Sequence, residues 1–274
     1  MEDNTVLRQH ARNARRNIVK MVANAKSGHP GGSLSAIDVL TYLYFNVMNI
    51  EKENLTDIDR DKFVLSKGHA SPALYAVLAE KGFIEEEELM TFRLFGSRLQ
   101  GHPTYNPSIG VDMSTGSLGQ GISVAVGMAK AAKMKGTANH IYTMIGDGES
   151  EEGQVWEALM AAAHHKLDNL TVILDYNHLQ IDGNIADVIG PEPYPEKFNA
   201  FGLHVIECDG HDFDSIAKAF EEAASVTGKP CVIIANTVKG KGVSFMENQA
   251  NWHGVAPNEE QLAAALAELE GEDE

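Results

Sequence analysis

Cysteine is scarce in this chain of 274 residues, which contains only Cys208 and Cys231, each in a predicted strand. Two such residues exclude a disulfide framework and indicate buried thiols. Long apolar runs are also lacking, because no segment approaches the ~20 residues of a membrane span. The first 20 residues are polar and basic, without the apolar core of a signal peptide. We therefore expect a cytoplasmic protein without a membrane anchor.

Basic side chains are outnumbered, with 22 Lys and Arg against 39 Asp and Glu, and the formal net charge is −17. Such a chain would repel a phosphate backbone, which argues against a nucleic-acid partner. Seven acidic and no basic residues occur from Glu259 to Glu274. Residues 258–274 are therefore expected to form an acidic C-terminal helix or tail. No linker or repeat divides the chain, so residues 1–274 are predicted to form a single domain.

Apolar residues recur at helical spacing in some segments and form short continuous runs in others, which predicts an α/β fold. We predict helices at 6–25, 36–47, 71–80, 118–133, 151–165 and 213–225, and strands at 63–65, 140–145, 170–175, 203–208 and 231–235. Ser35 is the expected N-cap of the second helix. The alternation favours a doubly wound, mainly parallel sheet with helices on both faces. Ligands of such sheets bind beyond the carboxyl ends of the strands.

A metal site is indicated where two neighbouring strands end. Asp147 lies between Gly146 and Gly148 after one predicted strand, and Asn177 follows the next strand thirty residues later. A carboxylate, an amide oxygen and a nearby carbonyl are hard oxygen ligands suited to Mg²⁺. The alternative is a tight turn with a capping aspartate. The loop lacks the ligand spacing of an EF-hand.

Glycine-rich residues 114–121 open a predicted helix, with glycines at 116, 119 and 121. Main-chain groups at such a helix start can cradle an anion or a heterocycle. Close helix packing is the alternative interpretation. The spacing and position differ from those of the dinucleotide-binding fingerprint.

Four histidines lie in turns marked by glycine or proline, namely His29, His69, His102 and His253. Together they suggest a convergent imidazole cluster that binds hydroxyls and shuttles protons. A zinc site is the competing interpretation, but no HExxH or similar ligand spacing occurs. The other histidines lack this context and are interpreted as structural or solvated.

From about residue 5 to residue 257, these motifs resemble the diphosphate-binding domain of transketolases. The resemblance implies the thiamine-diphosphate-binding fold with thiamine diphosphate as the cofactor. Its metal, Mg²⁺ or Ca²⁺, would be bound by Asp147, Asn177 and the Leu179 carbonyl. By resemblance, the cofactor would contact His69, Gly116, Ser117, Leu118, Gly148, Asn177, Ile181, Lys239 and His253. The catalytic residues implied are the histidines of the donor-sugar channel, His29, His102 and His253.

The chain departs from full-length transketolases in length, because their pyrimidine-binding and carboxyl-terminal domains are absent. The resemblance implies that a C-terminal subunit supplies the pyrimidine-binding domain, in an expected heterotetramer. The reaction implied is transfer of a two-carbon ketol unit from a ketose phosphate to an aldose phosphate, as in the pentose phosphate pathway. Three alternatives stay open: the alpha subunit of a thiamine-dependent 2-oxo-acid dehydrogenase, a ketol transferase for an unusual sugar, and a regulatory cofactor-binding subunit without activity.

Overall fold

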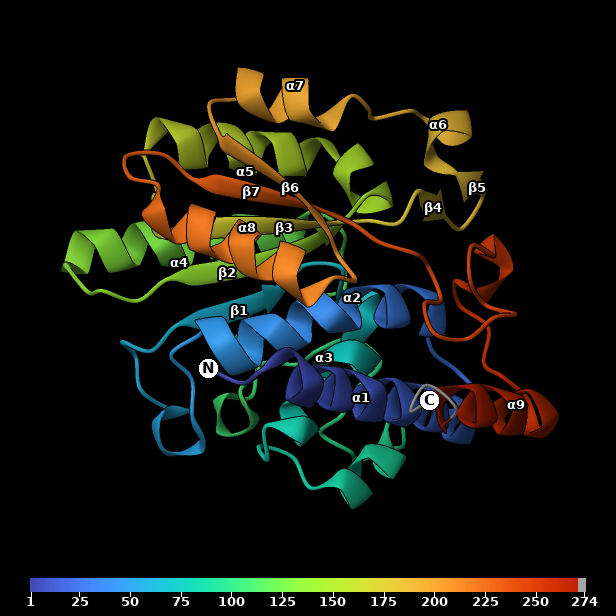
Figure 1. Cartoon of the computed structure of the whole chain (residues 1–274). Coiled ribbons are helices and arrows are strands. Elements are labelled where there is room, and N and C mark those ends of the chain that lie inside the picture. Colours follow the sequence, from blue (N-terminus) through green and yellow to red (C-terminus); the bar gives the residue numbers. More distant parts are fainter. Residues whose placement is uncertain (271–274) are drawn as a thin grey trace.

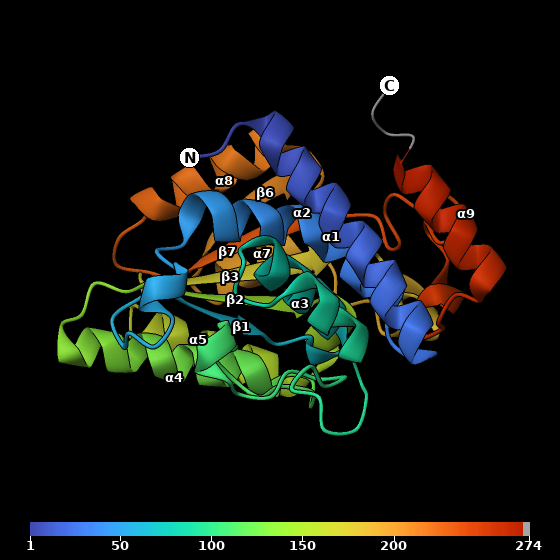
Figure 2. The same cartoon turned by 90° about the horizontal axis from the view of Figure 1, so that it is seen from below.

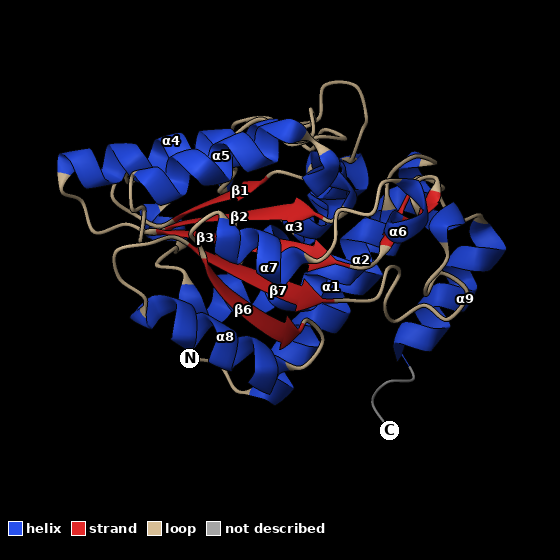
Figure 3. Cartoon of the chain, turned by 90° about the horizontal axis from the view of Figure 1, so that it is seen from above, coloured by secondary structure: helices blue, strands red, loops and turns tan. Residues whose placement is uncertain are grey.

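The computed structural model describes residues 1–270 and contains a sheet of five parallel strands. The strands are β1 (Lys62–Leu65), β2 (Ile141–Gly146), β3 (Leu170–Tyr176), β6 (His204–Asp209) and β7 (Cys231–Asn236), in the spatial order β1-β2-β3-β7-β6. All five point toward the side of the molecule that carries α6 and α9 (Figure 3). The predicted parallel α/β fold is confirmed.

Helices cover both faces of this sheet (Figure 1). One face packs against α4 (Gln120–Lys135), α5 (Gly153–His164) and α7 (Tyr194–Ala200). The other packs against α2 (Pro30–Tyr42), α3 (Ser71–Glu80) and α8 (Phe213–Ser225), and α1 (Asn4–Ala25) packs on α2 and α3. Within β2, Tyr142 and Met144 enter one core whereas Ile141 and Ile145 enter the other. This two-residue alternation explains why the strands read as continuous apolar runs.

The second helix begins earlier than the sequence suggested. It starts at Pro30, whose fixed φ angle suits the first turn of a helix, and it ends in a π-helical turn over Leu43–Val47. The prediction of Ser35 as the N-cap was therefore wrong. The Ser35 hydroxyl lies inside the helix and donates to Asp175 Oδ2 at 2.6 Å. This early start places His29 directly before the helix, beside the end of the sheet.

The acidic C-terminal segment forms α9 (Glu259–Glu270), which lies along α1 (Figure 2), and residues 271–274 fall outside the described part. Leu269 is fully buried, which contributes roughly 1.5–3 kcal/mol. The surface ion pair between Arg16 and Glu270, at 2.9 Å, is worth only about 0–1 kcal/mol. Apolar packing therefore does most to hold the helix, and Glu268 adds two hydrogen bonds from Ser244.

Short elements between β3 and β6 were not predicted. They are the hairpin strands β4 (Leu179–Gln180) and β5 (Gly183–Asn184), the single turn α6 (Ile185–Val188), and α7. Segments this short leave no periodic signal in the sequence. Both cysteines are buried and unpaired on neighbouring strands, as expected. None of the helices in residues 1–270 is long and apolar enough to cross a membrane.

Candidate active site

A cavity of about 230 Å³ opens at the carboxyl ends of β2 and β3. Most of the predicted site residues line it, namely His29, His69, Gly116, Leu118, Asp147, Gly148, Asn177, Leu179, Ile181, Lys239 and His253. Ser117 and His102 do not line it. Ser117 is exposed next to Gly116, and the His102 ring packs against Gly116, about 3.1 Å from where a Cβ would project. The neighbouring strand ends thus bring distant motifs together.

Asp147 lies at the end of β2 and is 3% exposed. Its Oδ1 accepts from the Gly148 amide at 2.8 Å, and its Oδ2 accepts from the His178 amide at 2.6 Å. Burial, together with the charge of Asp175, raises the pKa of Asp147 to about 7. A buried carboxylate with a raised pKa is stabilised by any cation that binds beside it.

Asn177 and Leu179 present two further oxygens to the same cavity. Asn177 Oδ1 accepts from the Leu179 amide at 3.2 Å, and the Leu179 carbonyl accepts from Lys239 Nζ at 3.1 Å. A carboxylate, an amide oxygen and a carbonyl form the hard-oxygen set that Mg²⁺ prefers. Within residues 1–270, no group of three or more His, Cys, Asp or Glu side chains is placed to bind a metal. The oxygens of Asp147, Asn177 and Leu179 fit an ion that completes its shell with phosphate and water oxygens.

A buried polar network beneath the cavity was missed by sequence reasoning. Asp175, 1% exposed, forms an ion pair with Lys67 and accepts from the hydroxyls of Ser35 and Thr237 at 2.6 and 2.5 Å. Burial alone would raise the pKa of Asp175, but Lys67 and these donors hold it below the usual value. Lys67 Nζ also donates to the Gly32 carbonyl at 2.8 Å. The sequence signal for this network was Asp175 itself, a charged residue in an otherwise apolar strand.

Glu149 joins the two glycine-rich segments. Its carboxylate accepts from the Gly119 amide at 2.9 Å and from the Gly146 amide at 3.1 Å. The Ser66 hydroxyl donates to it at 2.5 Å. These bonds tie the start of α4 to the end of β2. Gly116, which lies shortly before α4, and Gly146, at the end of β2, therefore both line the cavity. Glycine at position 116 is required by a φ of +148°.

Three of the four predicted histidines converge. The ring centroids of His29, His69 and His253 lie 5.2 to 5.4 Å from one another. His102 is separate and exposed, but it lies close enough to His29 to lower the pKa of that ring. The expected cluster is therefore a triad of imidazoles with a fourth at its edge.

The imidazoles of this triad are uncharged near neutral pH. Burial, followed by the charges of Arg93, His102 and Lys239, lowers the pKa of His29 to about 4. Burial and the neighbouring Lys239 lower the pKa of His253 to about 3. Burial also lowers the pKa of His69 well below its usual value. Neutral imidazoles can both donate and accept hydrogen bonds, which suits the handling of substrate hydroxyls.

The contact with Lys239 sets the tautomer of His253. Lys239 Nζ lies 3.0 Å from His253 Nδ1, and an ammonium group can only donate. Nδ1 is therefore the acceptor, and the ring proton is on Nε2. His253 thus offers one N–H donor to a bound molecule. On His29, Nδ1 is buried without a hydrogen-bond partner among the described residues, which marks it as a second point of contact.

Ile181 lies at the rim of the cavity and is 69% exposed.

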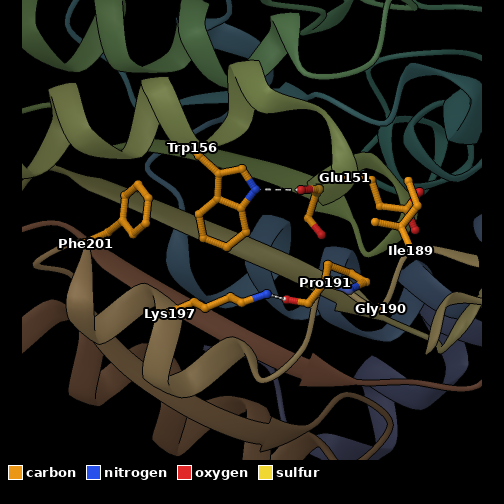
Figure 4. Close-up of a pocket in the computed structure, with 8 residues that line it drawn as sticks. Glu151, Trp156, Ile189, Gly190, Pro191, Lys197 and Phe201 are labelled. Carbon is orange, nitrogen blue, oxygen red and sulfur yellow. Dashed lines mark hydrogen bonds between the residues drawn. The ribbon is translucent and has the colours of Figure 1, made fainter.

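A second cavity, of about 450 Å³, is lined by residues of α5, α7 and the segment 189–191 (Figure 4). It shares no lining residue with the histidine cavity. Two of its polar side chains are bonded within the lining, because Trp156 Nε1 donates to the Ser150 carbonyl and Lys197 Nζ to the Pro191 carbonyl. It contains none of the predicted site residues.

The buried neutral histidines make the stability of the unliganded chain depend on pH. In the unfolded chain a histidine takes up a proton near pH ~6.5, whereas the folded His253 pKa is about 3. The folded state then binds fewer protons, so the contribution of His253 is fully present above pH ~6.5 and is lost as the pH falls toward 3. Asp147, with its raised pKa, has the opposite sign.

We therefore expect His253→Asn to flatten the acid side of the stability profile. The measurement is the free energy of unfolding by urea at pH 7 and pH 5, for wild type and variant. Wild type should lose more stability between these values than the variant does. His164→Asn, at the end of α5, is the control and should keep the wild-type slope. Equal slopes for wild type and His253→Asn would contradict the buried neutral state.

The sequence matches the family model described as transketolase, thiamine diphosphate binding domain, over residues 7–272. It is 47% identical over 273 residues to the 6-deoxy-6-sulfo-D-fructose transketolase subunit SqwG of Clostridium sp. (strain MSTE9), covering 99% of both chains. An apulose-4-phosphate transketolase subunit of Actinobacillus succinogenes is 43% identical over 267 residues, covering 97% of this chain and 96% of that protein.

Longer relatives match over a part of their length. Human transketolase is 41% identical over 249 residues, which are 90% of this chain and 39% of that protein. The crystal structure of transketolase from Campylobacter jejuni superposes with a TM-score of 0.90 at 35% identity, covering 98% of this chain and 43% of that one. Because the family model matches nearly all of its length, the chain belongs to the transketolase family, in which it corresponds to the thiamine diphosphate binding domain.

Proposed function

We propose that this chain is the diphosphate-binding subunit of a two-chain transketolase that transfers a two-carbon ketol unit from a ketose phosphate to an aldose phosphate. The observation that carries the proposal is a single cavity with metal-type oxygens and a triad of neutral imidazoles. The oxygens suit a metal-bound diphosphate, and the imidazoles suit a hydroxyl-rich substrate. Residues 1–274 act in this proposal as one domain.

The metal in this proposal is Mg²⁺, with Ca²⁺ as a substitute, held by Asp147, Asn177 and the Leu179 carbonyl. Lys239 Nζ now bonds that carbonyl and is well placed to turn to a phosphate oxygen. The remaining proposed cofactor contacts are His69, Gly116, Ser117, Leu118, Gly148, Ile181 and His253. When bound, thiamine diphosphate supplies the electron sink for breaking and making a carbon–carbon bond.

The chain's own residues orient the sugar and manage protons. The Nε2–H group of His253 donates to a substrate oxygen, where it stabilises charge that develops there. His29, with its unpartnered Nδ1, and His102 accept or return hydroxyl protons. The buried network around Asp175 and Lys67 keeps the floor of the cavity rigid.

A second chain completes the enzyme in this proposal. Relatives that match along their whole length are named as transketolase subunits, whereas the longer relatives continue well beyond the matched region. We propose a C-terminal subunit with the pyrimidine-binding domain as the partner, in a heterotetramer with two-fold symmetry. The names of these relatives also refer to different sugars, so the donor is part of the test.

We expect ketol transfer only when both chains are present. The measurement uses this chain alone, and then mixed with a candidate partner encoded by a neighbouring gene, with thiamine diphosphate, Mg²⁺ and ribose 5-phosphate as acceptor. Xylulose 5-phosphate, apulose 4-phosphate and 6-deoxy-6-sulfo-D-fructose serve as donors. We propose that the donor is xylulose 5-phosphate, as used in the pentose phosphate pathway. The donor with the highest turnover tests this choice.

Failure has two separate forms. A mixture that forms a complex and binds cofactor, but turns over no donor, would contradict catalysis and favour a regulatory cofactor-binding subunit. Decarboxylation of a 2-oxo acid by the mixture would favour the dehydrogenase alternative. The family match favours neither of these outcomes.

A further inference from the structure

Lys239 owes its position in the cavity to a short segment that follows β7. The Lys239 carbonyl accepts from the Asn248 amide at 2.9 Å, and the Gly240 amide donates to the Gly31 carbonyl at 3.0 Å. From this segment the side chain reaches the Leu179 carbonyl and His253. Residues 238–242, called here the lysine segment, contain no helix or strand, so their placement depends on contacts with other parts of the chain.

His211 makes one of these contacts from the connection between β6 and α8. The Val238 amide donates to His211 Nε2 at 2.8 Å, and His211 Nδ1 lies 2.7 Å from Asp38 Oδ2. Because Nε2 accepts a hydrogen bond, the ring proton is on Nδ1 and is donated to Asp38. Both ring nitrogens are thus used, and one of them holds the main chain next to Lys239.

Arg15 holds the other end of the lysine segment and shares the same carboxylate. Its guanidinium bonds Asp38 Oδ2 at 2.5 Å and donates to the Lys241 carbonyl at 3.2 Å. A Cβ on Gly242 would lie 3.0 Å from Arg15, so the segment passes close over this side chain. Asp38 is buried in α2 and serves as the common anchor of Arg15 and His211.

We propose that His211 is a positioning residue for the cofactor site, which acts through the Val238 main chain to hold Lys239 in the cavity. It touches neither the cavity nor the proposed metal ligands. Groups that support binding residues from behind fix the geometry of a site, and their loss commonly costs about 10–100-fold in affinity or activity. The proposal rests on the proposed function only in that Lys239 serves the cofactor.

Two substitutions separate the two bonds of His211. The amide of His211→Gln ends near the position of the ring Nε2, so its oxygen can accept from Val238. The amide of His211→Asn ends near the position of Nδ1, so its nitrogen can donate to Asp38 but the side chain cannot reach Val238. A role confined to the hydrogen bond with Asp38 predicts that Asn is the milder change, whereas a role in positioning the Val238 main chain predicts that Gln is.

The first measurement is amide hydrogen exchange of the chain without cofactor. The informative amides are those of Gly240 and Asn248, because they hold the lysine segment but do not contact His211. We expect His211→Asn to reduce their protection at least tenfold and His211→Gln to leave it within about threefold of wild type. The second measurement is the dissociation constant for thiamine diphosphate with Mg²⁺ in the two-chain complex, which should rise about tenfold in His211→Asn only.

Asp112→Asn is the matched control, because Asp112 forms a buried ion pair with Arg60 away from the lysine segment. It should lower the melting temperature without selective loss of protection at Gly240 and Asn248. Equal protection of these two amides in wild type and His211→Asn, or a greater loss in His211→Gln, would overturn the proposal. Selective loss of protection with unchanged cofactor affinity would place the error in the assigned role of Lys239 instead.

Discussion

Replacing Asp147 by alanine is expected to abolish the metal-dependent binding of thiamine diphosphate. Asp147 is the only carboxylate among the three proposed metal ligands, and the other two are neutral oxygens. A divalent ion bound without it would lose its direct charge partner in a buried site. Since changes behind a metal ligand already cost about 10–100-fold in affinity, loss of the ligand itself should cost more than about 100-fold. Calorimetric titration of cofactor into the two-chain complex, with and without Mg²⁺, measures the effect.

The control for Asp147 is a variant that keeps the shape of the side chain. Asp147→Asn should also lose Mg²⁺-dependent affinity, yet the unliganded chain should stay folded. Because burial and Asp175 raise the folded pKa of Asp147 to about 7, the ionised carboxylate destabilises the unliganded fold, and increasingly so as the pH rises from 4 to 7. The variant should therefore gain stability relative to wild type over this range. Wild-type affinity at matched Mg²⁺ would reject the assigned metal site.

Much of this site was predictable because parallel strands end at one edge. The register pairs Gly146 with Asp175, so residues that follow β2 and β3 must lie together. The same geometry explains why Asp147 and Asn177 could be assigned to one site from spacing alone. The glycine- and proline-marked turns identified His29, His69 and His253 because ligand-binding loops lie at this edge of the sheet: His69 lies between β1 and α3, and His29 lies in the turn between α1 and α2.

What the sequence did not reveal depends on packing between distant elements. Lys67 and Asp175 are 108 residues apart, and neither has a local pattern that names the other. The start of α2 was misplaced because Gly31 and Gly32 read as a turn. Here their small size lets the helix approach other main chain, since a Cβ on Gly31 would lie 2.8 Å from the Trp252 carbonyl. His211 was set aside although it follows Gly210, because both of its side-chain contacts are long-range and no local pattern names the partners.

Replacing His253 by alanine is expected to lower the turnover of the two-chain enzyme by about 10²–10⁴-fold, the usual contribution of a positioned proton-transfer group. Its Nε2–H group is the donor that the contact with Lys239 leaves available. The measurement is the rate of ketol transfer at saturating cofactor and donor. Saturation matters because removal of the ring also frees Lys239 Nζ, which changes cofactor affinity separately from chemistry.

A second variant distinguishes hydrogen bonding from proton transfer at this position. His253→Gln keeps a donor near the position of Nε2 but cannot exchange a proton near neutral pH, so it should recover part of the turnover only if stabilisation of a substrate oxygen is the main role. His164→Ala, on the far end of α5, should leave the rate unchanged. A wild-type rate in His253→Ala would remove His253 from the chemistry. The proton would then have to be handled by His29 and His102, whose pKa values are also lowered by burial first and by Arg93 next.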